Sequence, residues 1–280
     1  MSVHNIITIA QLTFIEMRRR RLVLAALGCG AGLLLLFAAA VYLITHGPPP
    51  PRPVSLVQSR IQLQLVELAG LYCVNLLSAA VAILLPIDTL AGEIASGVMQ
   101  TLASKPVRRW EIVLGKWLVF FVLSAAYIAL MVGGIVLAMR LTTGFTQAHV
   151  PAATGLMVLQ ASVLLGIVMA GGARLTTIAN GVVAFGYYTI AVIGGWIEQI
   201  GVMVGSTDAR HIGTAISLVS PTDAVWRRAV HLLQPPIMSE VTITPFAGPS
   251  VPSDAMLWWA AAFALGALLL AMRWFGRRPL

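Results

Sequence analysis

Six apolar stretches, each long enough to cross a bilayer, constrain this chain more than any other feature of its sequence. A membrane-spanning helix needs about 20 consecutive apolar residues. The interior of each stretch holds no Asp, Glu, Lys, Arg or His. We therefore expect an all-α membrane protein, a single domain over residues 1–280, with six transmembrane helices near residues 22–45, 68–87, 117–139, 150–173, 175–198 and 255–272.

The composition agrees with this prediction, and the placement of the charges argues against nucleic acid as a partner. Hydrophobic residues make up 59% of the chain and charged residues 10%, whereas soluble domains carry about 25% charged residues. The net charge of +8 would suit a nucleic-acid-binding protein if it formed one basic surface. The basic residues instead cluster at the ends of the apolar stretches, which is typical of membrane orientation. We expect membrane lipid, and no nucleic acid, around this protein.

The positions of Lys and Arg also predict which ends of the helices face the cytoplasm. If the N-terminus is inside, twelve of the 18 Lys and Arg residues lie on the inner side, and the positive-inside rule favours this arrangement. The prediction is an N-in/C-in topology with a cytoplasmic arm over residues 1–21, a cytoplasmic loop over 88–116 and a larger extracytoplasmic segment over 199–254. The twelve inner residues are Arg18, Arg19, Arg20, Arg21, Lys105, Arg108, Arg109, Lys116, Arg174, Arg273, Arg277 and Arg278.

Two helices outside the six spans are also predicted. The first 17 residues show apolar residues at helical spacing, so they form either an interfacial helix along the inner surface or simply the start of the first span. Within 199–254, the sequence Ser220-Pro-Thr-Asp223 has the residue types of a helix N-terminus. The helix that follows has one apolar face, so we expect it to lie flat on the membrane or on the other helices.

The sequence lacks the residues that several classes of function require. Ion-coupled carriers usually need an ionisable group within a span, and none is predicted there. The sequence Gly92-Glu-Ile-Ala-Ser-Gly97 lacks the Lys and Ser/Thr of a phosphate-binding P-loop. The five His residues have no metal-ligand spacing, and no catalytic triad pattern is visible. We expect no enzyme activity, no metal site and no cofactor in this chain alone.

The loop over 88–116 is the most polar part of the inner side. Ile94, Val98 and Leu102 recur every four residues, which predicts a short amphipathic helix with Glu93 on its polar face towards the cytoplasm. Pro106 would end it, because proline disfavours helix in the residue before it. The basic residues of the loop could serve only as topology anchors, or the loop could be a docking surface.

The loop carries, in this order, Asp88, Glu93, Gly97, Pro106-Val107, Arg109, Glu111 and Leu114-Gly115-Lys116. This pattern resembles the inner loop of ABC transporter permeases of the type-two export family. The resemblance extends more loosely over the six helices and the N-terminal arm. Ile94, Ala95 and Val98 depart from the usual pattern of the family, in which the first two are often charged and the third is Thr. Together with the neighbouring Arg108, the residues that the resemblance assigns to this loop are Asp88, Glu93, Gly97, Pro106, Arg109, Glu111, Gly115 and Lys116.

This resemblance implies the permease subunit of an ATP-driven exporter in a bacterial or archaeal inner membrane. The listed residues would couple it to a separate ATP-binding subunit, present in two copies, which would bind ATP and magnesium. A second permease copy would complete a homodimer, and Asn75, Tyr187 and Tyr188 are candidates for its substrate path. The alternatives are a permease for maturation of a secreted metalloenzyme, of the nitrous-oxide reductase type, an ion-coupled carrier, or a structural membrane subunit. The substrate is left open.

Overall fold

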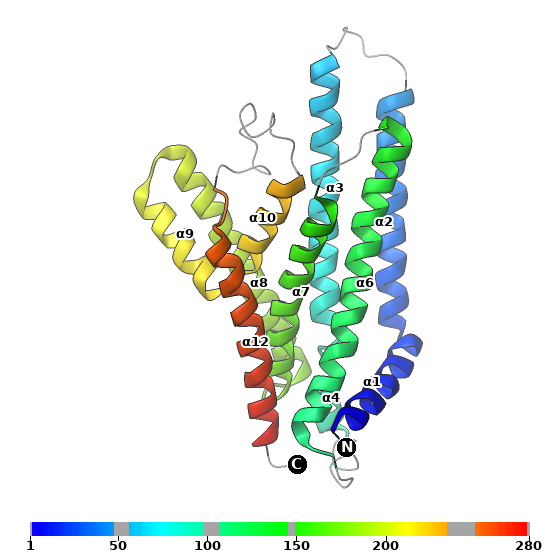
Figure 1. Ribbon diagram of the computed structural model, residues 1–280, viewed down its shortest axis with the longest axis vertical. Coiled ribbons are helices and arrows are strands. Elements are labelled where there is room, and N and C mark those ends of the chain that lie inside the picture. Colours follow the sequence, from blue (N-terminus) through cyan, green and yellow to red (C-terminus); the bar gives the residue numbers. More distant parts are fainter. Residues whose placement is uncertain (1, 48–55, 98–106, 145–148, 234–249, 279–280) are drawn as a thin grey trace.

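A computed structural model describes residues 2–47, 56–97, 107–144, 149–233 and 250–278, and over these residues the protein is all-α (Figure 1). Six helices are long and apolar enough to cross a membrane, namely α2, α3 (over Ile61–Leu84), α6, α7, α8 and α12. This confirms the predicted fold class. The helices are α1 (Ser2–Arg19), α2 (Arg21–His46), α3 (Leu56–Leu84), α4 (Ala91–Ala95), α6 (Arg109–Thr143), α7 (Val150–Gly172), α8 (Thr177–Val204), α9 (Thr207–Val219), α10 (Thr222–Leu233) and α12 (Asp254–Gly276).

The helices form an elongated bundle with both chain termini at the same end (Figure 1). Helix α4, between α3 and α6, lies at this end as well. We call the end of the bundle that carries both termini the N/C end. An even number of crossings produces this arrangement, and it gathers the predicted inner segments in one region.

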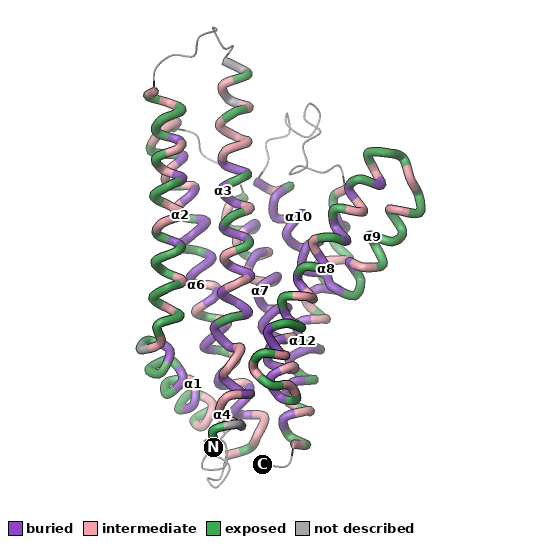
Figure 2. Tube along the Cα trace, turned by 180° about the vertical axis from the view of Figure 1, so that it is seen from behind, coloured by how far each residue is buried: buried purple, intermediate pink, exposed green. Residues whose placement is uncertain are grey.

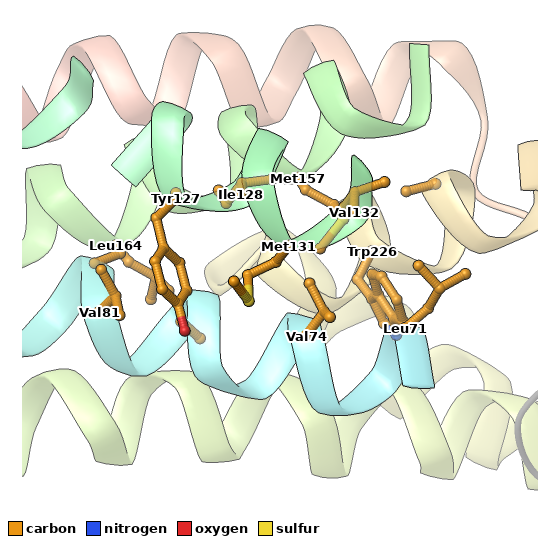
Figure 3. Packing of buried hydrophobic residues seen from close by; sticks show 14 of the residues in the cluster. Leu71, Val74, Val81, Tyr127, Ile128, Met131, Val132, Met157, Leu164 and Trp226 are labelled. Carbon is orange, nitrogen blue, oxygen red and sulfur yellow. The ribbon is translucent and has the colours of Figure 1, made fainter. Parts of the chain in front are cut away.

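Helix α7 occupies the centre of the bundle, because it packs against α3, α6, α8, α10 and α12. Figure 3 shows the core beside it, where Leu71, Val74 and Val81 of α3 face Tyr127 and Met131 of α6. Helix α2 is mostly exposed along its length (Figure 2), and apart from Arg21 and His46 at its two ends its exposed residues are apolar. An apolar outer surface of this kind suits contact with lipid.

Helix α1 is separate from the first span. The backbone at Arg20 is extended, with φ −75° and ψ 130°, so the helix breaks there and α2 begins at Arg21. Helix α1 then runs obliquely across the N/C end and packs on α6 (Figure 1). Of the two interpretations of the first 17 residues, the structure supports a distinct helix at the end of the bundle.

Two predicted spans are parts of longer helices. Helix α6 has 35 residues, which at 1.5 Å per residue is about 52 Å, well beyond the roughly 30 Å of a bilayer core. Part of α6 therefore projects beyond the apolar layer. Helix α3 begins at Leu56 rather than near residue 68, so Glu67 lies inside a candidate span and is only 4% exposed. The expectation that no span holds an ionisable residue is therefore wrong.

The described part of the segment 199–254 is not a loop outside the bundle. Helix α8 continues to Val204, α9 folds back along α8, and α10 then packs on α7 and α8. Ser220, in the turn between α9 and α10, donates a hydrogen bond from its hydroxyl to the Tyr187 carbonyl at 3.3 Å. Tyr187 lies ten residues into α8, or about 15 Å from its start, which is about half the thickness of a bilayer core. The α9–α10 hairpin therefore dips into the bundle.

Glycines allow α9 to approach α8 closely. A Cβ atom on Gly194 would lie 2.3 Å from Ile216, and one on Gly213 would lie 2.5 Å from the Cβ of Glu198. Small residues are typical of tight helix contacts in membranes, where close backbone approach replaces the hydrophobic driving force. The hairpin is thus a packed element. Its second helix, α10, lies on the other helices, which is one of the two positions expected for it, whereas α9 was not expected from the sequence.

Candidate functional site

The described residues of the segment 88–116 lie at the N/C end, and most of them contact other helices of the chain. Asp88 follows α3, and its Oδ1 accepts a hydrogen bond from the Thr177 hydroxyl at 2.9 Å. A Cβ atom on Gly92 would lie 2.1 Å from that same oxygen, so a side chain here would displace the Asp88 carboxylate. Nearby, the Asn180 amide donates to the Ile87 carbonyl at 3.4 Å. The end of α3 is therefore fastened to the start of α8.

Glu93 of α4 forms an ion pair with Lys116 of α6. The Glu93 side chain is 14% exposed and that of Lys116 only 5%. We expected Glu93 on the face of α4 that is open to water, and this is wrong. A nearly buried lysine is costly unless a carboxylate neutralises it, because water cannot solvate the charge. Glu93 supplies that charge and ties α4 to α6.

Glu111 and Gly115 hold α1 against α6. Glu111 Oε2 accepts hydrogen bonds from the backbone N–H of Arg108 and from the Asn5 amide, each at 3.1 Å. The first bond caps the N-terminus of α6, and the second reaches α1. A Cβ atom on Gly115 would lie 3.0 Å from the Ile6 carbonyl oxygen, so the small residue permits the crossing of α1.

Arg109 contacts the C-terminal end of α12. Its guanidinium donates to the backbone carbonyls of Gly276, at 3.4 Å, and of Arg278. Arg278 in turn donates to the Ala173 carbonyl at 2.8 Å, and the Arg174 guanidinium lies 4.3 Å from the centre of the Trp274 ring. Cations are favourable at a helix C-terminus, where the carbonyl groups are unpaired. These contacts join α6, α7 and α12.

Three further predicted residues differ from this pattern. Arg108 is exposed at the surface of the N/C end. Gly97 has a φ of +75°, in the left-handed region that favours glycine, and a Cβ there would meet nothing within 4 Å. Pro106 lies outside the described residues.

The structure brings together two of the three predicted substrate-path residues. The Asn75 amide of α3 donates to the Tyr188 hydroxyl of α8 at 3.3 Å, and both side chains are buried. Tyr187 points elsewhere, because its hydroxyl donates to the Val219 carbonyl of α9 at 3.2 Å.

A buried ion network lies close to this pair and was missed by the sequence analysis. The guanidinium of Arg227, 4% exposed, lies 2.8 Å from Glu198 Oε2 and 3.0 Å from Asp223 Oδ2. The Ser250 hydroxyl donates to the second oxygen of Glu198. The network therefore links α8, α10 and the start of the segment before α12.

Electrostatics within the network keep Arg227 charged. Burial raises the pKa of Asp223 to about 6, even though the positive charge of Arg227 opposes this. Burial also pulls the pKa of Arg227 down, but the carboxylates of Glu198 and Asp223 outweigh it and raise that pKa. A Cβ atom on Gly195 would lie 1.7 Å from Asp223 Oδ2, so glycine at this position makes room for the carboxylate.

One signal for this network was present in the sequence. Asp223 and Arg227 are four residues apart on a predicted helix, a spacing that places the two side chains on one face. Glu198 gave no signal, because it ends a predicted span and its partner lies 29 residues away. Among the described residues, no group of three or more His, Cys, Asp or Glu side chains is arranged to hold a metal ion.

The apolar helices and the polar contacts at the N/C end define a multi-pass membrane protein. A model of the family described as ABC-2 family transporter protein matches residues 7–272. The chain therefore belongs to the ABC-2 transporter family, whose members are membrane subunits of ABC transporters and work with an ABC ATP-binding subunit. No curated protein matches the chain.

Proposed function

We propose that this chain is the permease subunit of an ATP-driven exporter and that residues 88–116 dock onto the ATP-binding subunit. In this proposal the topology is N-in/C-in, so the N/C end lies in the cytoplasm of a prokaryotic cell. The arginine distribution and the common position of the two termini support this orientation. ATP and magnesium bind to the partner, which is present in two copies beside a permease homodimer.

The observation that carries the proposal is the way the segment 88–116 is fastened to the helix ends. Asp88 reaches α8, Glu93 reaches α6, Glu111 reaches α1 and Arg109 reaches α12. A partner that displaces this segment therefore pulls on several helices together. Packed helices respond by shifting between discrete arrangements rather than by deforming gradually. This is the mechanical requirement for coupling nucleotide-driven motion to a membrane path.

The Asn75–Tyr188 pair is the proposed point where the substrate path opens between α3 and α8. The two side chains are closed on one another in this structure. A neutral hydrogen bond contributes only about 1 kcal/mol net, so separation of the two helices at this point costs little. The ion-coupled carrier is disfavoured, since Asp223 and Glu198 are paired with Arg227. Neither of these two residues, nor the buried Glu67 of α3, lines the apolar cavity that lies among α2, α3 and α6.

Co-purification with a co-expressed ATP-binding subunit tests the docking surface. Arg108 is the best probe, because it is exposed, whereas changes at Glu93 or Arg109 also break contacts within the chain. Arg108→Glu places a negative charge where the partner meets a positive one, and we expect recovery of the ATP-binding subunit to fall about tenfold or more. Arg277→Glu is the matched control, since Arg277 is also exposed at the N/C end.

Three results bear on the proposal. Wild type and Arg277→Glu that retain the ATP-binding subunit, together with an Arg108→Glu protein that loses it while inserting normally, support docking through this segment. A wild-type chain that never retains the subunit contradicts the coupling proposal. Equal retention by wild type and Arg108→Glu contradicts the location of the docking surface.

A further inference from the structure

A partly open apolar cavity of about 180 Å³ lies among α2, α3 and α6. Val81 of α3 and Leu85, directly after α3, are buried at its floor, whereas Leu27 of α2 and Leu130 of α6 are exposed at its rim. The full lining is Val23, Ala26, Leu27, Val81, Leu85, Leu123, Ala126, Tyr127 and Leu130. The cavity therefore opens sideways between α2 and α6, on the surface that faces lipid.

The cavity exists because α2 and α6 approach closely around Gly30 and Gly134 but not in the part nearer the N/C end. Farther along α2, a Cβ atom on Gly30 would lie 2.8 Å from Met131, and one on Gly134 would lie 2.6 Å from Leu34. Nearer the N/C end, large side chains of the two helices do not fill the space between them. The Tyr127 hydroxyl bounds the cavity on the side of Gly30 and donates a hydrogen bond to the Ala26 carbonyl at 3.3 Å. The one polar side chain of the lining is thus already paired.

An apolar molecule fits this space better than water does. A protein cavity of about 150 Å³ with aliphatic and aromatic walls stays dry and binds benzene. Water in the present cavity would find hardly any free polar atoms with which to make its usual two to four hydrogen bonds. In a bilayer the surrounding medium offers acyl chains, which are apolar along their length and need no hydrogen-bond partners in such a space.

Arginines lie at the depth where the headgroup of such a lipid would be. Arg18 lies in the last turn of α1, Arg21 begins α2, and both are exposed. At 1.5 Å per residue, Val23 to Leu27 lie about 3–9 Å along α2 from Arg21. A phosphate beside these arginines would therefore place the first part of its acyl chain at the cavity. The charge favours a lipid with a net negative headgroup over a zwitterionic one.

We propose that the cavity among α2, α3 and α6 binds one acyl chain of an anionic phospholipid whose headgroup contacts Arg18 and Arg21. The bound lipid fills the space between α2 and α6 at the N/C end. This site requires only that the chain spans a bilayer, which its family membership and its six apolar helices establish. Failure of the lipid site and failure of docking to an ATP-binding subunit are therefore separate results.

Native mass spectrometry of the full chain tests the site. The protein is reconstituted in bilayer discs of equal parts phosphatidylglycerol and phosphatidylcholine, released into mild detergent, and its retained lipids are counted. Ala126→Phe fills the cavity from its rim, and we expect this variant to retain one phosphatidylglycerol fewer per chain than wild type. Ala129→Phe is the matched control, because Ala129 is exposed on α6 and does not line the cavity.

A second pair of variants tests the headgroup without touching the cavity. An arginine near a membrane surface contributes about 1 kcal/mol to the binding of anionic lipid, which is about a fivefold change in affinity. Arg18→Gln with Arg21→Gln should lower the preference for phosphatidylglycerol over phosphatidylcholine about thirtyfold. Arg273→Gln with Arg277→Gln removes the same charge from exposed positions near the end of α12 and should leave that preference unchanged.

The outcomes separate the two parts of the proposal. Retention of the same lipids by wild type and Ala126→Phe overturns the acyl-chain site, and is the result expected if the cavity belongs to a substrate path instead. Equal retention of phosphatidylglycerol and phosphatidylcholine by wild type overturns the role of the arginines. Loss of one anionic lipid in Ala126→Phe, together with loss of preference in the arginine variant alone, supports both parts.

Discussion

Replacement of Arg227 by methionine should destabilise the protein strongly, because it leaves two acidic side chains without their cation. Arg227 lies within 3.0 Å of both Glu198 and Asp223 and is nearly inaccessible to water. Removal of one partner from a buried ion pair costs about 3–5 kcal/mol, since the remaining charge is uncompensated. Methionine has a similar length, so the packing of α10 is largely kept and the loss reports on charge.

Thermal unfolding in detergent, followed by tryptophan fluorescence, measures this effect. For a chain of this length, each kcal/mol shifts the Tm by about 2–4 °C, so Arg227→Met should lower the Tm by about 10 °C. Arg228→Met is the neighbouring control. Arg228 pairs with Asp254, whose side chain is 77% exposed, and exposed pairs contribute about 1 kcal/mol or less. An Arg227→Met protein whose Tm matches that of Arg228→Met would refute the reasoning.

Three further predictions concern the same contacts. Gly195→Ala should lower the free energy of unfolding by about 1–3 kcal/mol, because its Cβ would overlap Asp223 Oδ2. Gly186→Ala on the same helix is the control, since its Cβ meets nothing within 4 Å and the change should be neutral or slightly stabilising. The unfolding midpoints of the two variants are compared. Asp223 has a pKa raised from 3.8 to about 6, so its contribution to stability is present below pH 4 and is lost as the pH rises through 6. The stability of wild type relative to Asp223→Asn should therefore fall by about 3 kcal/mol between pH 4 and 7, and a flat difference across this range would argue against a buried, titrating Asp223. Lys116→Met should lower the unfolding midpoint by leaving Glu93 unpaired, and the charge swap Glu93→Lys with Lys116→Glu should restore the midpoint if the ion pair is what stabilises this contact.

The six spans were predictable because a bilayer requires long apolar helices, and the chain has few charged residues to obscure them. Their boundaries were less predictable, since a helix continues past the apolar layer wherever packing supports it. Helix α6 extends to Arg109 because Glu111 caps it and α1 covers Gly115. Helix α3 likewise begins at Leu56, well before the expected start near residue 68.

The hairpin of α9 and α10 and the ion contacts could not be predicted from local patterns. Gly194, Gly201 and Gly213 look like ordinary glycines of an apolar segment, and their role appears only when α9 lies against α8. The position of Glu93 depends on Lys116, 23 residues later. The spacing of apolar residues shows which face of a helix is polar, but not whether a charged residue of another helix lies against that face. The polar face of α4 was therefore predicted to face water.

Photo-crosslinking from the segment after α4 tests the central claim, that this end of the permease contacts an ATP-binding subunit. A photoreactive amino acid replaces Ser96, which is exposed beside Gly97, or Leu141, which is 77% exposed near the opposite end of α6. With a co-expressed ATP-binding subunit, we expect a crosslinked permease–ATPase product from position 96 and none from position 141. A product from position 141 alone, or none from either position in a complex that co-purifies, would contradict the account.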